Sequence, residues 1–271
     1  MISNIDDFKF SFRVGTTSYI LPDDILANVR FLADKVQDIE LLFFEVDDDK
    51  NVLPPSATVR ELQAIAGDYN LTYTVHLPLD SQLPGVQGER YSSTIKTARV
   101  INATSVLNPW AYILHLDGHQ LPPDPAPDQL KRWQDECVYA LRMIGQHTGE
   151  AGKIAVENTE HYPPEWLDPI FSGASFSRCV DIGHLWLAGL NPLPPLIRSL
   201  PRIRVVHIHG VVVRDHRSLD VMPEKNVEAV VHTLLENRFS GVLTLEIFNE
   251  SDLRSSLAVL ERIRRRLWDA D

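Results

Sequence analysis

The feature of this sequence that most constrains its fold is a regular alternation of short apolar runs with longer amphipathic stretches. Eight runs are rich in β-branched and aromatic residues, and they cover residues 12–19, 39–45, 71–78, 110–118, 153–159, 177–184, 203–210 and 241–248. Short runs of this kind predict buried β-strands, and the stretches between them predict helices that connect parallel strands. Eight such units predict a single (β/α)8 TIM barrel, which we expect to form one domain over residues 1–271.

The stretches between the runs carry helical signals. Apolar residues at helical spacing predict helices over residues 23–36, 57–70, 128–147, 226–239 and 251–268. An aspartate, Asp23 or Asp24, is the expected N-cap of the first helix, and Gly67 and Asn70 are stop signals for the second. The helices therefore fall between the strands, as βαβ units require.

A doubly wound open sheet is the alternative architecture. Such a sheet usually has fewer strands and a Gly-rich turn after its first strand. Here the first turn reads GTTSY over residues 15–19, without a G-x-G-x-x-G pattern. The barrel is therefore favoured.

The charge balance argues against a nucleic acid partner. The chain has 26 basic and 37 acidic residues and a formal net charge of −11, whereas proteins that bind nucleic acid backbones have a basic surface. The basic run from Arg262 to Arg266 is better explained as the last turn of a helix. No segment approaches the roughly 20 apolar residues of a membrane span, and the first residues lack a signal-peptide pattern. With Cys137 and Cys179 alone there is no disulfide framework, so we expect a cytoplasmic protein, and nothing indicates an oligomeric state.

Acidic and histidine residues recur where the predicted strands end. From the second run to the eighth, these residues are Glu45, His76, His115, Glu157, Asp181 with His184, His207 with His209, and Glu246, and His216 follows in the loop after the seventh run. Because the C-terminal ends of TIM-barrel strands meet at one face, these side chains are expected to converge there. Charged and imidazole groups are rarely buried unless they are paired or bind a metal.

This joint pattern predicts a divalent-metal site. Imidazole and carboxylate donors without a thiolate suit zinc, manganese or iron, and a bridging carboxylate allows one to three ions. Taken singly, His76, His115 or His184 could be a satisfied core or loop histidine, and Glu45 could pair with Arg13. Cys179 is expected to be a small packing group. Only the convergence of the whole set favours a metal.

Five motifs carry a resemblance to a known family. They are VENT at residues 156–159, VDIGH at 180–184, VVHIHG at 205–210, RDHRSL at 214–219 and LTLEIF at 243–248. In order and spacing they resemble the xylose isomerase-like barrels, a superfamily of AP-endonuclease-type phosphodiesterases and of sugar isomerases and epimerases. The resemblance covers essentially the whole chain and implies a TIM barrel with a metal centre.

The resemblance also implies a set of ligands. The four residues that hold one ion in the epimerases correspond to Glu157, Asp181, His207 and Glu246. The additional ligands of the endonuclease-type members correspond to His76, His115, His184 and His216. The aspartate that those members have two residues before the last histidine is replaced here by Arg214, so a third ion would lack one ligand.

Roles in the reaction follow from this correspondence. Catalytic roles are assigned to Glu157, His184, His216 and Glu246, where the two histidines contact phosphate or protonate the leaving group if they do not hold a third ion. Contacts to the substrate are assigned to Glu45, His209 and Arg214.

A narrower resemblance lies near the start of the chain. The sequence FRVGTTSYILPDDILANVRFLADKVQDIELLFFE at residues 12–45, with LTYTVHLPLD at 71–80, is similar to the cobamide-remodelling phosphodiesterases of the CbiR family. It implies a corrinoid substrate related to vitamin B12. The implied reaction is hydrolysis of the nucleotide-loop phosphodiester, which yields cobinamide phosphate and the riboside of the lower ligand.

Three alternatives remain open at this point. A sugar isomerase or epimerase would use Glu157 and Glu246 as ligands and as an acid–base pair, but it leaves His76, His115 and His216 without a role. A DNA-repair enzyme conflicts with the acidic charge balance. A barrel that only binds a corrinoid or a sugar phosphate, without turnover, belongs to a different class.

Overall fold

The computed structural model describes residues 10–44, 53–79, 81, 83–84, 87–172 and 175–268, and these form a closed barrel of eight parallel strands. In chain order the strands are β1 (Arg13–Thr17), β2 (Asp38–Leu42), β3 (Thr72–His76), β4 (Tyr112–His115), β5 (Ile154–Glu157), β6 (Ser177–Asp181), β7 (Ile203–Ile208) and β8 (Val242–Leu245). The barrel closes because β1 pairs with β8, with Arg13 opposite Val242 and Thr16 opposite Leu245. The predicted TIM barrel is confirmed.

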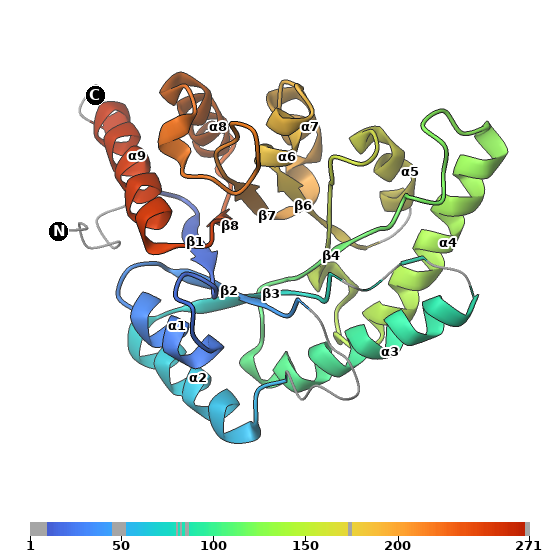
Figure 1. Ribbon diagram of the computed structural model, residues 1–271, viewed down its shortest axis with the longest axis horizontal. Helices are drawn as coiled ribbons and strands as arrows, with labels where there is room; N and C mark the ends of the chain where they lie inside the picture. The colour runs from blue at the N-terminus through green and yellow to red at the C-terminus, as the bar shows by residue number, and fades with distance from the viewer. Residues whose placement is uncertain are drawn as a thin grey trace.

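Helices surround the strands on the outside of the barrel (Figure 1). They are α1 (Ile25–Leu32), α2 (Ser56–Tyr69), α3 (Gln87–Thr104), α4 (Pro127–Gly145), α5 (Asp168–Phe171), α6 (Ile182–Leu187), α7 (Leu193–Ser199), α8 (Glu224–Glu236) and α9 (Glu250–Trp268). The expected caps of the first two helices are present in part. The Asp24 side chain accepts a hydrogen bond from the Ala27 N–H, and Asn70 ends α2 with a left-handed φ of 52°. Gly67 lies inside α2 and does not end it.

One long helix, α3, was not predicted. Its sequence, QGERYSSTIKTARVINAT, has few apolar residues and no clear apolar stripe. The apolar spacing that identifies the other helices is therefore weak here. Packing against the rest of the barrel, including α4, accounts for its presence better than its own periodicity does.

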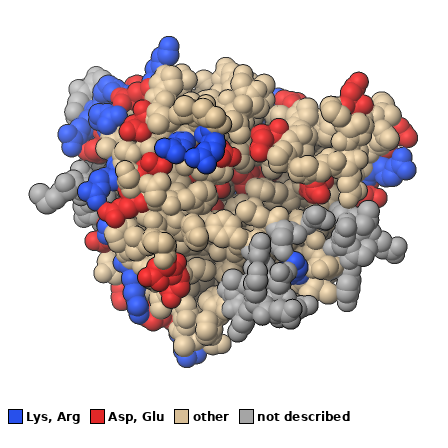
Figure 2. Space-filling view, in the orientation of Figure 1, with Lys and Arg blue, Asp and Glu red and all other residues tan. Residues whose placement is uncertain are grey.

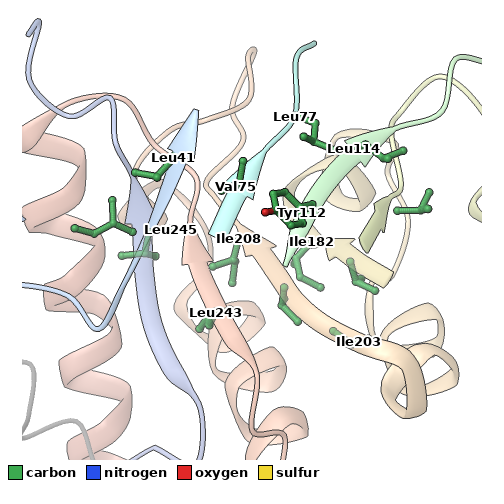
Figure 3. Close-up of a cluster of buried hydrophobic side chains, with 14 of the residues drawn as sticks. Leu41, Val75, Leu77, Tyr112, Leu114, Ile182, Ile203, Ile208, Leu243 and Leu245 are labelled. Carbon is green, nitrogen blue, oxygen red and sulfur yellow. The ribbon is translucent and has the colours of Figure 1, made fainter. Parts of the chain in front are cut away.

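The apolar core has two parts, because side chains alternate between the two faces of each strand. The larger part lies between the barrel and the helices, and Figure 3 shows some of it, including Val75, Tyr112, Ile208 and Leu245. The smaller part lies inside the barrel and consists of Ala111, Ile113, Ala155, Cys179, Val205 and Val242. Cys179 therefore packs in the core, as expected. Small apolar residues fill one end of the barrel interior and leave the C-terminal end to polar side chains.

The surface agrees with the charge balance. On the face in Figure 2, acidic and basic side chains of the described residues are interspersed and form no continuous basic area. In the basic run at the end of α9, Arg262 and Arg266 form ion pairs with Glu224, and Arg266 also pairs with Glu228. Within the described part of the chain, no helix is both long and apolar enough to cross a membrane.

Candidate metal centre

The strand ends bring the predicted residues together at the C-terminal mouth of the barrel. Register places His115 on β4 beside Glu157 on β5, and Asp181 on β6 beside His207 on β7. His76 ends β3, and Glu246 directly follows β8. Asp181, Glu157 and His207 are completely buried, which indicates that their charges are compensated within the site.

Glu157 is the centre of this arrangement, because its two oxygens face different imidazoles. Glu157 Oε2 lies 3.1 Å from His115 Nε2 and 3.3 Å from His76 Nε2. Glu157 Oε1 lies 3.2 Å from His207 Nδ1. One carboxylate therefore belongs to two neighbouring groups of potential ligands, as a bridging ligand does.

The first group consists of Glu157, Asp181, His207 and Glu246, whose ligand atoms all lie within 4.8 Å of one another. Asp181 Oδ2 and Glu246 Oε2 are buried and have no hydrogen-bond partner among the described residues. Glu246 Oε2 lies 3.3 Å from His207 Nδ1, but without hydrogen-bond geometry. Unpartnered buried carboxylate oxygens are costly, and a divalent cation would satisfy them, so these donors fit a metal ion.

The second group is His76, His115 and Glu157. His76 Nδ1 lies 2.9 Å from the Leu77 carbonyl, to which it donates its proton in the neutral ring. This leaves the Nε2 lone pair of His76 directed at the site, which is the orientation that metal-binding histidines adopt.

The third group is His184, His209 and His216. His184, in the first turn of α6, lies with Nδ1 3.1 Å from the Asn158 carbonyl, so its Nε2 also remains available. The His216 N–H donates to His209 Nδ1 at 3.0 Å, which places the neutral-ring proton of His209 on Nε2, 3.4 Å from Asp181 Oδ1. His209 Nε2 is buried and approaches Asp181 without forming a hydrogen bond to any described residue, so His209 connects the third group to Asp181 of the first.

The pKa values of these groups reflect their mutual attraction. Burial raises the pKa of the Glu157 carboxyl, but the charges of His207 and His115 outweigh it and hold the pKa well below its usual range. Burial lowers the pKa of His76, and contact with Glu157 together with the charges of Glu40 and Glu246 more than reverses this, to about 9.

His184 and His216 behave in the same way. Burial lowers the pKa of His184, but the charges of Asp181 and Glu157 raise it to about 9. Burial also lowers the pKa of His216, and its contact with Glu246 raises it to about 9. In the metal-free protein, protons therefore hold the positions that cations would take, and cations would have to displace them.

The prediction missed Glu40, a completely buried acid on β2. Glu40 Oε2 lies 2.9 Å from His207 Nε2, and this contact holds the His207 ring with Nδ1 towards Glu157 and Glu246. The run at residues 39–45 contains two acids, and alternation places Glu40 and Glu45 on opposite faces without deciding which face is inward. Glu45, which was predicted instead, lies outside the described residues, and β2 ends at Leu42.

Two further predicted residues lie at the same mouth. His216 is in the loop after β7, with a positive φ of 53°, and its side chain is only partly exposed. Arg214, two residues earlier, is exposed, and its guanidinium forms no hydrogen bond or ion pair with the part of the chain that the structure describes. A contact between Arg214 and the substrate remains a prediction.

The mouth opens into a cavity of about 180 Å³. Its lining combines imidazoles of the second and third groups and Glu246 with five apolar side chains. The ionisable residues are His76, His115, His184, His216 and Glu246, and the apolar residues are Leu42, Phe43, Phe44, Leu79 and Phe248. An anionic or polyhydroxylated group in this cavity would meet the candidate ligands directly.

Comparison with known proteins identifies the architecture. The family model described as "Xylose isomerase-like TIM barrel" matches residues 33–265. No curated protein is detectably similar to the chain in sequence. Among solved structures, one described as a D-tagatose 3-epimerase-like protein is 19% identical, with a TM-score of 0.78 over 96% of this chain and 99% of its own.

Two other solved structures have the same fold. The 3-keto-D-glucoside 4-epimerase YcjR from E. coli is 16% identical, with a TM-score of 0.68 over 93% of this chain and 99% of its own. Endonuclease IV from Thermus thermophilus is 17% identical, with a TM-score of 0.67 over 96% of this chain and 100% of its own. At these identities the likeness concerns the fold alone.

Proposed function

Because this chain belongs to the xylose isomerase-like TIM barrel family, we propose that it is a metal-dependent enzyme that hydrolyses a phosphodiester at the mouth of the barrel. The observation that carries the proposal is the position of Glu157 between two ligand groups. His76 and His115 face Glu157 Oε2, while His207 faces Oε1. A reaction that needs a single ion would leave His76 and His115 without a task, whereas phosphodiester hydrolysis commonly uses adjacent ions.

The residues present suit the chemistry. Divalent ions at such a site would neutralise phosphoryl oxygens and lower the pKa of a bound water. His184 lines the cavity from the first turn of α6, and His216 lines it from the loop after β7. Because their pKa values are about 9, both imidazoles are protonated at neutral pH in the metal-free protein, and either Nε2–H could donate to an anionic oxygen. Leu42, Phe44 and Phe248 add apolar surface to the same cavity.

A cobamide is the substrate that we propose. Support for it comes from the sequence resemblance of residues 12–45 and 71–80 to the cobamide-remodelling phosphodiesterases. The expected reaction cleaves the bond between the phosphate and the ribose of the lower-ligand nucleoside, which gives cobinamide phosphate and a free riboside. The acidic charge balance argues against a nucleic acid substrate.

A sugar isomerase or epimerase is the second candidate, and the structural comparisons favour it over the cobamide assignment. Two of the similar structures described above are named as epimerases or epimerase-like. The first group, in which Glu157 and Glu246 both lie close to His207 Nδ1, contains the four ligands and the acid–base pair that this activity needs. It assigns no role to His76 and His115.

The test uses purified protein loaded with Mn²⁺, Zn²⁺ or Fe²⁺. Release of cobinamide phosphate and riboside from adenosylcobamide, measured by mass spectrometry, is the expected result, and the chelator-treated protein should release neither. Incorporation of solvent deuterium into D-tagatose, without cleavage of the cobamide, would instead establish the isomerase or epimerase.

One variant separates the two functions within the site. His115→Asn removes a ligand from the second group and leaves all four residues of the first group in place. We expect it to abolish hydrolysis, whereas an epimerase that uses the first group would keep most of its turnover. His232→Asn is the matched control, because His232 is an exposed histidine on α8, away from the mouth.

A further inference from the structure

Three aromatic side chains meet beside the metal centre, one from each of three neighbouring strands. Phe248 follows β8, Tyr19 follows β1, and Phe44 follows β2. The ring centroids of Tyr19 and Phe44 are 5.1 Å apart at an interplanar angle of 83°, and those of Phe44 and Phe248 are 6.5 Å apart. We call Tyr19, Phe44 and Phe248 the aromatic cluster.

The aromatic cluster is accessible to solvent. Tyr19 is 48% exposed and Phe44 is 37% exposed, and Phe248 is partly exposed. A single exposed apolar residue is ordinary on a protein surface, but several grouped around a cavity indicate a binding site. In the same loops, Phe43 and Ile20 are almost completely buried and pack in the core. Packing therefore does not explain why the cluster itself faces water.

The cluster joins the metal centre to a second cavity. This cavity, of about 470 Å³, is lined by Tyr19 and by mainly apolar residues of the loops after β1 and β2. Leu42, Phe43 and Phe44 line both this cavity and the mouth above the metal groups. Phe248 also packs on His216, with ring centroids 5.0 Å apart. A substrate whose reacting group lies at the metal groups would therefore have the aromatic cluster directly alongside.

A further cavity, of about 600 Å³, shares His184 with the mouth. Its lining combines His119, His161 and Glu160 with apolar and aromatic residues, among them Tyr162 and Trp166. Glu160 Oε2 lies 3.7 Å from His184 Nε2, so ionisable groups adjoin the metal groups from this cavity.

We propose that the aromatic cluster, together with the cavity of about 470 Å³ beside it, binds a planar aromatic ring carried by the substrate. Rings at steep angles to one another expose both a face and an edge, and a planar ring can stack on the face while it meets the edge of its neighbour. The proposal rests on the proposed function in one respect: the ring belongs to the molecule whose phosphodiester lies at the metal groups.

Binding of ring-bearing probes tests the site without any turnover. Adenosine and benzimidazole are titrated by calorimetry into chelator-treated protein, with ribose as the probe that lacks a planar ring. We expect both ring probes to bind and ribose not to bind. A parent protein that binds neither ring probe overturns the proposal.

Substitutions then locate the site and identify the interaction. Tyr19→Ala and Phe44→Leu should each weaken binding by about tenfold, because stacking on one aromatic side chain contributes roughly 5- to 150-fold in affinity. Phe44→Leu keeps apolar volume and removes the plane, while Tyr19→Phe keeps the plane and should bind normally. Tyr69→Ala is the matched control, since Tyr69 is a similarly exposed tyrosine (54%) on α2 that lines a cavity with Arg13, at the opposite end of β1. Equal binding by Phe44→Leu and the parent would contradict the proposal.

The two proposals fail separately. Cobamide hydrolysis by a protein whose affinity for ring probes is unchanged by Tyr19→Ala and Phe44→Leu removes only the aromatic site. Ring binding that these variants weaken, in a protein that cleaves no phosphodiester with any metal, removes only the hydrolase.

Discussion

Asp38 and Glu157 are both completely buried carboxylates on barrel strands, yet their pKa values move in opposite directions. Burial raises both. Around Glu157, the charges of His207 and His115 reverse the effect. Around Asp38, the hydrogen bond that Thr72 donates is too weak to do so, Glu40 adds a like charge, and the pKa rises to about 7. What differs is the strength of the positive partners: His207 and His115 contact Glu157 directly, whereas the charge of Arg13 lowers the pKa of Asp38 by less than burial raises it.

The strongest test of this contrast removes the charge at the mouth. Glu157→Gln keeps the shape of the side chain but leaves two ligand groups without their shared anion. We expect turnover to fall by at least about 100-fold and bound metal to fall with it, because loss even of an outer-shell partner typically costs 10- to 100-fold. Turnover and metal content by mass spectrometry measure the effect. Glu236→Gln, at an exposed glutamate on α8, should match the parent. Full metal content in Glu157→Gln would refute the central role of Glu157.

A pH series tests whether the histidines of the same site are protonated in the metal-free protein. The pKa values of His76, His184 and His216 are about 9 in the folded protein, above the ordinary value of 6.5. In the metal-free protein the resulting stabilisation is complete below pH 6.5 and is lost as the pH rises through 9. Cations compete with these protons, so affinity for Zn²⁺ should rise by about tenfold per pH unit for each proton displaced between pH 6.5 and 9.

Calorimetric titrations in buffers of different ionisation enthalpy give both the affinity and the number of protons released. Zinc binding that releases no proton at pH 7 would show that the imidazoles are neutral in the metal-free site. This result would contradict the explanation that positively charged histidines lower the pKa of Glu157.

Removing the charge of Asp38 should stabilise the protein, in contrast to the loss expected at Glu157. The folded-state pKa of Asp38 is raised to about 7 from 3.8, so the contribution of this carboxyl to stability is greatest below pH 3.8 and is lost as the pH rises through 7. Asp38→Asn cannot ionise. We expect it to raise the free energy of unfolding at pH 8 by about 2 kcal/mol, which is half of the full linkage value, because a buried amide must also be satisfied.

Urea unfolding of the metal-free parent and of Asp38→Asn, at several pH values between 4 and 8, measures the difference. A difference that does not grow with pH would mean that Asp38 has an ordinary pKa.

The smallest expected effect tests how closely the third group is packed. A Cβ at Gly183 would lie 2.1 Å from His209 Cε1, so Gly183→Ala must displace the ring that contacts Asp181. We expect metal affinity to fall by about tenfold, as for loss of an outer-shell partner. Gly67→Ala is the matched control, since nothing lies within 4 Å of the added methyl group and the helix gains an alanine. Unchanged affinity in Gly183→Ala would separate His209 from the metal centre.

The sequence was sufficient for the fold because each strand is a short apolar run of its own. It also placed Glu157, Asp181 and His207, since each is the last or next-to-last residue of a strand and alternation directs it inwards. Glu40 could not be found in the same way. The apolar run continues past the end of β2, so the run alone does not define which of its residues form the strand. Pairing with β1 and β3 defines the strand, and it thereby selects Glu40 rather than Glu45 as the inward acid.

The aromatic cluster was equally hidden. Tyr19 and Phe248 are 229 positions apart in sequence and resemble ordinary core or rim residues when each is taken alone. Their proximity exists only because β8 pairs with β1, which periodicity within a single segment does not express.

That pairing also sets the order in which the protein can become active during synthesis. Thr16 Oγ1 donates to the Leu245 carbonyl across 229 residues, so on the ribosome β1 keeps an unpaired edge until the last strand has emerged. Glu246, which completes the first ligand group, emerges directly behind that strand. A nascent chain therefore cannot assemble the complete ligand group before its barrel is ready to close, and premature capture of metal by a half-made site is restricted to the residues from β3 to β7.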